Sequence, residues 1–358
     1  MQTIALTILL TVSAAYCSAQ LPAGLTISGY ADAYLAYSTD SLPTSEFQKF
    51  PTYAPRSNSV GLNIAQLSAA YKAEKIRALI TLHYGDIPAS SWSGTYNMIQ
   101  EANVGIRLHK KVWLDAGFFR THIGAEGLYP KENITSSIAP VTIFEPYYQA
   151  GIKLTCQLAP KLEGRLYLLN GYNVFVDNNR KKSLGMLFTY AFDSASSLVY
   201  ANYFGDDSFD PDTVRHNRFY NNLTFYYDKK KLRITAGLDY AIQQNSDLAG
   251  AGKTGMMIGG LLALRYAIRK QFNIYARSDF FRDRDGFLAG YYQDAAGHIK
   301  GLKTMAGTLG IEYKPYDNAY IRLEGRALQT YDDVKLFYWN KEYRDRRYDA
   351  IFSMGVWF

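Results

Sequence analysis

The sequence predicts an all-β protein, a transmembrane antiparallel β-barrel of about 16 strands. Three features of the sequence support this fold class: segments that are apolar at every second position, short connections that alternate with long ones, and an apolar face on the last strand. A β-strand points alternate side chains to opposite faces. Such strands can therefore turn one face to lipid and the other to water.

The composition agrees with this fold without requiring it. Of the 358 residues, 48% are hydrophobic and 15% aromatic, with 31 Tyr and 28 Gly, while the mean hydropathy is −0.20. No apolar run reaches the length of about 18 residues that a membrane-spanning helix needs. No Pro- or Ser-rich linker divides residues 21–358, so we expect one barrel domain there. A soluble, β-rich periplasmic binding protein fits the same composition and is an alternative.

The first 20 residues predict a secretory signal peptide, with an apolar run followed by small residues and cleavage after Ala19 or Gln20. Cleavage would remove Cys17, so that Cys156 has no intramolecular partner. We therefore expect no disulfide and no cysteine metal site. The signal peptide also implies export through an inner membrane.

Two kinds of connection alternate along the chain, which is the plan of a transmembrane barrel with short turns at one rim and long loops at the other. The predicted turns are residues 73–75, 109–111, 159–161, 193–195, 228–231, 268–270 and 315–318. The predicted loops are residues 39–58, 88–97, 125–144, 173–182, 206–217, 244–255, 283–301 and 331–346.

Between these connections the strands show the two-residue period. In residues 25–38, Tyr30, Asp32 and Tyr34 share the face opposite the apolar Ala31 and Leu35. The alternation slips at residues 65–66 and 118–119, where we expect β-bulges. In the strand at residues 321–327, three charged side chains share one face: Arg322, Glu324 and Arg326. Charges at every second position need a wet lumen, because a charge facing lipid at mid-bilayer costs roughly 2–4 kcal/mol.

The last strand is apolar at every second position and ends on an aromatic residue. Its apolar face comprises Tyr348, Ala350, Phe352, Met354, Val356 and Phe358. Resemblance to outer-membrane proteins in general implies that the last four of these, Phe352, Met354, Val356 and Phe358, form the signal read by the barrel-insertion machinery.

An ordered set of short segments resembles the OmpL-like β-barrel porin family, most strongly from residue 29 to about residue 203. The segments are Gly29-Tyr30 with Asp32 and Tyr34, residues 62–67, residues 99–102, residues 113–117 with 122–124, residues 146–148 and residues 169–172. The resemblance implies a pore for small hydrophilic solutes in the outer membrane of a Gram-negative bacterium, surrounded by lipid and lipopolysaccharide. It implies no catalytic residue and no cofactor.

The predicted lumen face carries more basic than acidic side chains, which would favour anions. Alternatively, these charges neutralise one another across neighbouring strands. The basic set is Arg77, Arg107, Arg120, Lys153, Arg165, Arg233, Arg265, Arg277, Arg282, Lys314, Arg322 and Arg326. The acidic set is Glu101, Asp115, Asp239, Asp279, Glu312 and Glu324.

The third long loop, residues 125–144, is the candidate constriction. In general porins this loop folds inward, and by that resemblance Glu126, Lys131 and Glu132 would face Arg120 and His122. An ordinary extracellular loop is the alternative. The candidate pore-lining residues are therefore Arg77, Glu101, Arg107, Asp115, Arg120, His122, Glu126, Lys131, Glu132, Arg322, Glu324 and Arg326.

The sequence offers no convincing catalytic or metal site. Residues 250–254 end like a phosphate-binding loop but lack its first glycine, and the five His residues show no metal-ligand spacing. We therefore expect no enzyme, metal, cofactor or nucleic-acid partner. A barrel-based outer-membrane lipid hydrolase is the alternative in another class. The sequence leaves the oligomeric state open, a homo-oligomer included.

Overall fold

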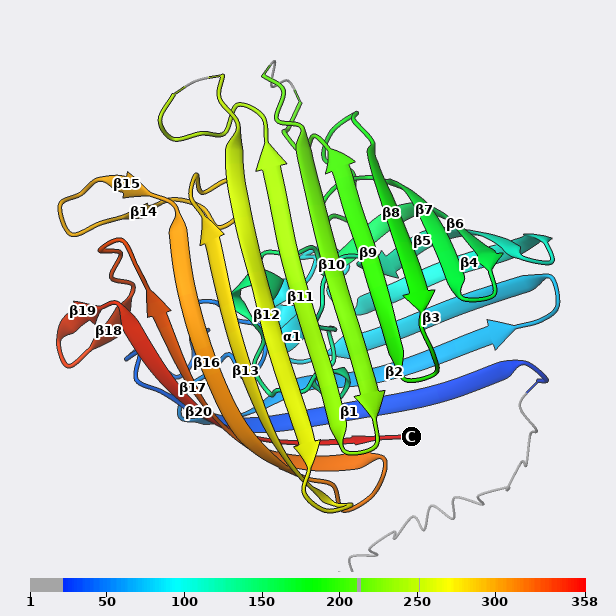
Figure 1. The fold of residues 1–358 in the computed structure, drawn as a ribbon, viewed down its shortest axis with the longest axis horizontal. Coiled ribbons are helices and arrows are strands. Elements are labelled where there is room, and N and C mark those ends of the chain that lie inside the picture. The colour runs from blue at the N-terminus through cyan, green and yellow to red at the C-terminus, as the bar shows by residue number, and fades with distance from the viewer. Residues whose placement is uncertain (1–21, 211–213, 251) are drawn as a thin grey trace, which may run out of the picture.

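A computed structural model describes residues 22–210, 214–250 and 252–358, and shows a closed antiparallel barrel of 16 strands (Figure 1). The predicted fold class is confirmed. The predicted signal peptide, residues 1–20, lies outside the described residues. The barrel strands, in order around the wall, are β1 (Leu25–Ser38), β2 (Ser59–Lys72), β3 (Ile76–Tyr84), β4 (Ile99–His109), β5 (Val112–Arg120), β6 (Tyr148–Ala159), β7 (Leu162–Leu169), β8 (Ser183–Ala191), β9 (Ser196–Gly205), β10 (Arg218–Lys229), β11 (Leu232–Gln243), β12 (Gly255–Ala267), β13 (Phe272–Asp283), β16 (Leu302–Tyr313), β17 (Ala319–Thr330) and β20 (Arg346–Trp357).

The connections sort by length as predicted. Short turns join β2 to β3, β4 to β5 and every second pair after that, and they form one rim, called the turn rim below. The long loops form the opposite loop rim and carry the remaining elements. These are α1 (Asp86–Ser91), η1 (Pro130–Glu132), α2 (Pro140–Ile143), the hairpin β14 (Tyr292–Gln293) and β15 (Ile299–Lys300), and the hairpin β18 (Phe337–Trp339) and β19 (Glu342–Arg344).

The barrel closes where β20 pairs antiparallel with β1, with Tyr30 opposite Trp357. The pairing continues beyond β20, because the backbones of Phe358 and Gly29 exchange two hydrogen bonds of 3.1 Å. A Cβ on Gly29 would come within 2.5 Å of the Phe358 ring. Glycine at this position therefore lets the ring lie against the first strand.

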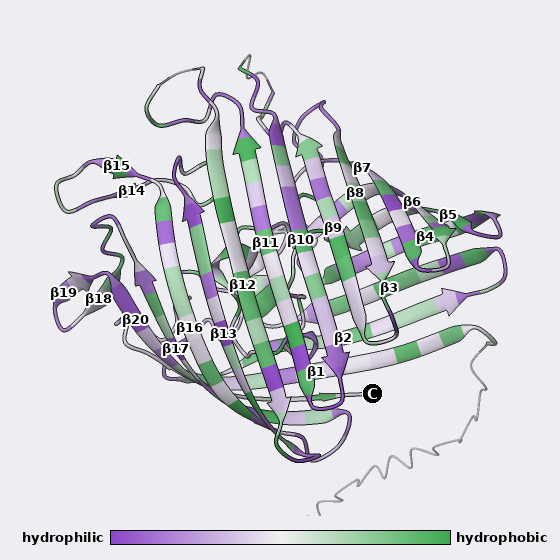
Figure 2. Cartoon of the chain, viewed as in Figure 1, coloured by the Kyte–Doolittle hydropathy of each residue, from purple (hydrophilic) through white to green (hydrophobic). Residues whose placement is uncertain are grey.

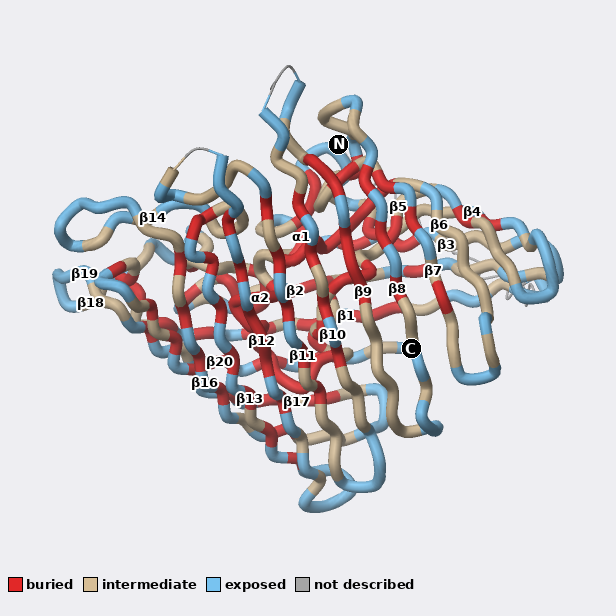
Figure 3. Tube along the Cα trace, turned by 45° about the horizontal axis from the view of Figure 1, so that its top comes forward, coloured by how far each residue is buried: buried red, intermediate tan, exposed pale blue. Residues whose placement is uncertain are grey.

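Hydrophobic and hydrophilic residues alternate along many strands of the wall (Figure 2). In β1, Tyr30, Asp32 and Tyr34 are buried inside, whereas Ala31 and Leu35 are exposed outside. The same alternation of buried and exposed positions is clear in β13 and β17, among other strands (Figure 3). Val60 and Leu309 are 78% and 70% exposed, although water would disfavour such large apolar side chains. An outer face of this kind suits lipid.

Neither bulge lies at its predicted position. At residues 65–66 the register is continuous, and the bulge lies two residues away: Asp32 faces Ile64 while Ala33 faces Leu62, which leaves Asn63 as the extra residue. At residues 118–119 the prediction is wrong, since β5 keeps a continuous register with β6 through both residues. The nearby irregularity is Gly117, whose φ of 132° only glycine adopts without strain.

Candidate functional site

The connection between β5 and β6, residues 121–147, lies inside the barrel and is called the inner loop below. Its atoms bond to strands around most of the wall, which an outward-facing loop could not do. The contacts are Lys131 N to Tyr30 Oη on β1 (3.2 Å), Gln66 Nε2 on β2 to Tyr129 Oη (2.6 Å), Tyr226 Oη on β10 to Ala125 O (3.0 Å), Arg233 Nη2 on β11 to Glu132 O (2.7 Å) and Ser136 Oγ to Ser353 Oγ on β20 (2.8 Å).

Local sequence explains the compact path of the inner loop. The short helices η1 and α2 each begin at a proline, which fixes φ and needs no hydrogen-bond acceptor for its nitrogen. Asn133 ties the loop to itself: its Oδ1 accepts from Gly127 N at 2.7 Å and its Nδ2 donates to Gly127 O at 2.8 Å. Ile134 and Val141 pack into one apolar cluster with wall residues, and Ile138 packs into another.

Arg322 holds the inner loop against β17. Its Nε bonds to Glu312 Oε2 at 2.8 Å, and its two terminal nitrogens donate to the carbonyls of Pro130, Asn133 and Thr135 at 2.9–3.2 Å. The side chain is only 2% exposed. Arg322 thus lies on the inward face, but its hydrogen-bonding groups are used by the protein itself.

Arg277 on β13 has the same arrangement. It forms ion pairs of 2.8 Å with Asp279 and with Glu126 of the inner loop, and it donates to Ser137 O at 2.6 Å. Its side chain is fully buried. The candidate constriction residue Glu126 is therefore ion-paired with Arg277 and not with Arg120 or His122. Sequence reasoning missed this contact because Arg277 and Glu126 are distant in the chain.

Arg120 and Glu132 are the candidate residues that the structure does bring together. Two hydrogen bonds of 3.1 and 2.6 Å join the guanidinium to the carboxylate, and their side chains are 28% and 38% exposed. The Arg120 guanidinium also lies 4.6 Å from the centre of the Tyr129 ring. Glu101 lies beside them, accepting a bond from the Arg120 backbone nitrogen at 3.2 Å. This group of charges remains open to solvent.

Two other candidates lie close to this group but contact different partners. His122 is buried, and its ring nitrogens lie 2.7 Å from Gln149 Oε1 and from Asn202 O of the wall. It lines the same cavity as Arg120, Glu126 and Glu132 but bonds to none of them. The Lys131 ammonium lies over the rings of Tyr30, Tyr129 and Trp357, at 4.8–5.7 Å from their centres.

The remaining candidates are distributed along the wall. Arg77 binds Asp115 with Nε to Oδ1 at 2.6 Å. Arg107 reaches the turn rim and donates to the carbonyl of Lys110 at 2.7 Å. Glu324 Oε2 accepts from Ser136 N of the inner loop at 2.6 Å. Arg326 is buried in the wall next to β20.

The expected position of Arg282 is wrong. Along β13 the buried, inward residues are odd-numbered and include Tyr275, Arg277 and Asp279, whereas Arg282 is exposed on the outer face. Arg282 is next to the loop-rim end of the strand, where the cost of a charge on the lipid face falls to about 0–1 kcal/mol. This arginine therefore adds nothing to the lumen.

A cavity of about 480 Å³ lies between the inner loop and the wall from β4 to β10. It extends towards the turn rim, because Thr189 and Tyr226 near the turn-rim ends of β8 and β10 line it. Opposite charges lie on its two sides. The wall contributes Arg120, Lys153 and Arg165 together with Glu101, and the inner loop contributes Glu126, Glu132 and Glu145.

Glu145 is the cavity residue that sequence reasoning missed. It is 4% exposed, and its Oε1 has no hydrogen-bond partner within the described residues. Burial, with Asp239 beside it, raises the pKa of the Glu145 carboxyl well above its usual range. A Cβ on Gly124 would come within 2.3 Å of Glu145 Oε2, so this carboxyl approaches the backbone closely. A single acid before a proline carries no sequence signal for such a role.

The loop rim is covered by residues 39–58, called the outer cap below. Phe50 of the outer cap packs edge-on against Phe144 of the inner loop and Phe337 of β18, with ring centres 6.1 and 6.3 Å apart. Arg347, the second residue of β20, donates to the carbonyl of Lys49 at 2.6 Å. The outer cap is therefore a second layer of chain across the barrel interior, between the inner loop and the loop rim.

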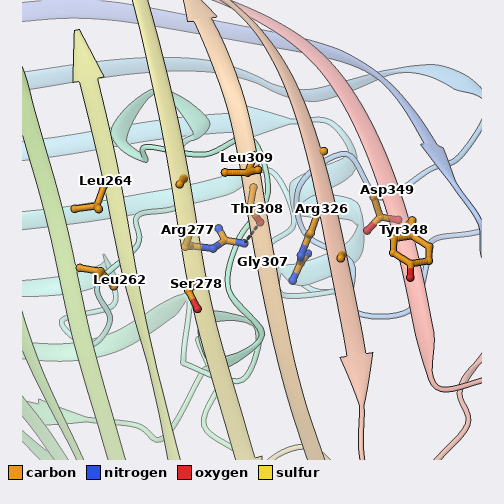
Figure 4. A pocket seen from close by; sticks show the side chains of 13 residues that line it. Leu262, Leu264, Arg277, Ser278, Gly307, Thr308, Leu309, Arg326, Tyr348 and Asp349 are labelled. Carbon is orange, nitrogen blue, oxygen red and sulfur yellow. Dashed lines mark hydrogen bonds between the residues drawn. The ribbon is translucent and has the colours of Figure 1, made fainter. Parts of the chain in front are cut away.

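A groove of about 720 Å³ lies on the opposite, outer face of the wall (Figure 4). Leu262, Leu264 and Leu309 rim it, and its floor includes Gly307 and Gly325, which present no side chain. Its side chains offer lipid an apolar surface, so we place the functional site in the interior cavity. In the part of the chain that the structure describes, no group of three or more His, Cys, Asp and Glu side chains could hold a metal ion.

Comparisons with known proteins agree with this architecture. The family described as "Putative beta-barrel porin-2, OmpL-like" matches residues 24–358. No curated protein matches the chain.

No helix in residues 22–210, 214–250 and 252–358 is long and apolar enough to cross a membrane.

Solved outer-membrane structures share the fold at low sequence identity. An anion-selective porin from Comamonas acidovorans has a TM-score of 0.61 and 10% identity, with 93% of this chain and 99% of that chain covered. The outer membrane channel DcaP of Acinetobacter baumannii has a TM-score of 0.60 and 10% identity, covering 93% and 97%. OmpT, an outer membrane protein of Vibrio cholerae, has a TM-score of 0.58 and 12% identity, also covering 93% and 97%.

Proposed function

The chain belongs to the OmpL-like β-barrel porin family, and on that premise we propose that it forms a water-filled channel for the passive diffusion of small hydrophilic solutes. Family and fold support a location in the outer membrane of a Gram-negative bacterium. The observation that carries the proposal is the charged cavity between the inner loop and the wall. Charges of opposite sign across a narrow aqueous space concentrate and orient polar solutes.

We propose a modest preference for anions. The chain carries a formal net charge of +7, and one similar structure is described as anion-selective. The preference is modest because most inward arginines are paired with acids, as Arg277 and Arg322 are. Salt weakens it, since the Debye length is about 8 Å at physiological ionic strength.

Planar-bilayer recording tests the channel and its selectivity together. Purified protein should produce discrete conductance steps, and the reversal potential in a potassium chloride gradient should lie on the anion side and move towards zero as salt rises. Protein that is folded and inserted yet conducts no ions would refute the channel. A reversal potential on the cation side would refute only the selectivity.

The channel proposal includes no catalytic role. Hydrolysis of short-chain esters and phospholipids by the purified protein would favour the alternative, an outer-membrane lipid hydrolase. It would overturn the proposal that the protein has no catalytic role. The other alternative, a soluble periplasmic binding protein, predicts that the chain stays in the periplasmic fraction. We expect it instead in outer-membrane extracts, with gel migration that changes on heating.

We also propose the orientation and processing of the chain. The turns at residues 73–75 and 315–318 would face the periplasm, and the loop at residues 283–301 the outside, as the sorting of short and long connections suggests. Cysteines introduced in the loop should react with an impermeant reagent on intact cells, and those in the turns should not. Mass spectrometry of the mature protein should show cleavage after Ala19 or Gln20.

The last proposal concerns partners. The outward residues Phe352, Met354 and Val356 of β20, with Phe358, would be read by the barrel-insertion machinery, and outer-membrane lipid and lipopolysaccharide would surround the wall. Deleting Phe358 should lower the inserted fraction, whereas normal insertion would contradict a signalling role. A homo-oligomer is tested by the mass of the protein in detergent complexes.

A further inference from the structure

Arg326 differs from the other arginines on its part of the wall. Its side chain is buried at 6% exposure on the inward face of β17, yet no carboxylate among the described residues lies within ion-pair distance of it. Its Nε and Nη2 have no hydrogen-bond partner there either. By contrast, Arg277, Arg322 and Arg347 each bind an acid, namely Asp279, Glu312 and Asp349.

The acids close to Arg326 bind other arginines. Asp349 lies opposite Arg326 in the register of β17 and β20, but it binds Arg347 with Nε to Oδ1 at 3.0 Å. Asp279, on β13, binds Arg277 through Oδ2 at 2.8 Å, while its Oδ1 has no hydrogen-bond partner among the described residues and lies beyond ion-pair distance of Arg326. A buried guanidinium without a counter-charge is costly, and so are its unsatisfied donors. An anion is the species that would satisfy both.

The position of Arg326 gives such an anion a route. Glu324, the inward residue one step nearer the turn rim, bonds to Ser136 of the inner loop. Leu328, one step nearer the loop rim, pairs in register with Arg347, which bonds to Lys49 of the outer cap. Arg326 therefore lies between the two layers of chain that cross the interior, where a solute moving past the outer cap towards the inner loop would meet it.

We propose that Arg326 is a binding site for the oxyanion group, carboxylate or phosphate, of a solute in the channel. The planar fork of a guanidinium matches both groups through two parallel hydrogen bonds. The neighbouring Arg277 and Arg347 add positive potential, and the Thr308 side chain lies next to Arg326 in the register. That the anion belongs to a solute passing through the channel rests on the proposed function. Binding of an anion at Arg326 does not depend on it.

Thermal unfolding of the purified full chain in detergent tests the site with inorganic phosphate as the probe. A ligand that binds only the folded state raises the unfolding midpoint with its concentration. Replacing chloride by phosphate at constant ionic strength should therefore raise the midpoint of the wild type. In Arg326→Gln the apparent affinity should fall by about tenfold or more, because charge-assisted hydrogen bonds are lost.

Two further variants make the result decisive. Arg282→Gln removes an exposed arginine from the outer face and should respond to phosphate as the wild type does. Arg326→Lys keeps the charge but loses the planar fork, so it should bind phosphate more weakly and serves if the Gln variant does not fold. A wild-type response in folded Arg326→Gln, or no response to phosphate in the wild type, would overturn the site.

The same protein in bilayers separates this inference from the proposed channel. Phosphate binding that depends on Arg326, in a chain that does not conduct, would leave the site intact and refute the channel. A conducting chain whose phosphate response ignores Arg326 would refute the site alone.

Discussion

Two regions of the barrel wall present arginines to the interior in different ways. On the β13–β20 side, Arg277 and Arg322 are 0% and 2% exposed and bind acids and inner-loop groups. On the β5–β7 side, Arg120 and Arg165 are 28% and 37% exposed and line the cavity. The comparison shows that an inward arginine can hold the loop or face the solute, depending on what covers it.

The energetics of the two regions differ accordingly. Removing one partner of a buried ion pair costs roughly 3–5 kcal/mol, because the other charge is left uncompensated. A partly exposed pair contributes only about 0.2–1 kcal/mol, because solvent screens it. Substitutions of Arg277 or Arg322 on the β13–β20 side should therefore act on structure, and those of Arg120 or Arg165 on the β5–β7 side should act on ion selectivity.

The largest effect is expected from Arg322→Gln. The change leaves Glu312 without its guanidinium and removes the donors to three inner-loop carbonyls, so the inner loop should detach from β17. We expect a higher single-channel conductance and faster proteolytic cleavage within residues 121–147. Arg282→Gln is the control and should leave both unchanged. Wild-type conductance and protection in Arg322→Gln would show that the loop does not depend on this anchor.

A smaller effect, on selectivity alone, is expected from Arg120→Gln. The barrel should stay folded, since the pair with Glu132 contributes at most about 1 kcal/mol. Loss of one positive charge from the cavity should move the reversal potential towards cations. Glu132→Gln removes the opposite charge of the same pair and should move it towards anions. Equal reversal potentials in the two variants would place the conduction path elsewhere.

The smallest effect is a pH dependence that Glu145 gives the inner loop. The pKa of the Glu145 carboxyl is raised while the inner loop is packed against the wall, which is called docked here. When the loop is undocked, this carboxyl therefore ionises at a lower pH, near the usual carboxyl value of 4.5. Docking should therefore be strongest in acid and weaken with rising pH until the docked carboxyl also ionises. Conductance should increase over that range in the wild type and change less in Glu145→Gln. An equal pH profile in both would assign the dependence to another group.

Sequence reasoning predicted the wall well because the information is local. The two-residue period placed Tyr30, Asp32 and Tyr34 on the inward face of β1, and the sorting of connections by length led to the observed strand number. Both signals depend on neighbouring residues within a strand or turn. They are therefore readable before any tertiary contact is known.

The partners inside the barrel could not be read in this way. Arg322 lies on a predicted inward face, but its carbonyl partners belong to a loop that is distant in sequence and offers no side-chain pattern for them. His122 lines the same cavity as Arg120, yet the partners of its ring, Gln149 and Asn202, lie on strands that are distant in sequence. Such positions are set by packing of the whole interior.

The pairing of β20 with β1 also has a consequence for biogenesis. These two strands come from opposite ends of the barrel sequence, so their contact has the largest sequence separation in the wall and the greatest loop-closure cost. Until they meet, both are open edges with unpaired backbone groups that attract other strands. A chain truncated before β20 would therefore leave β1 and β17 as unpaired sheet edges, which favours aggregation with other strands.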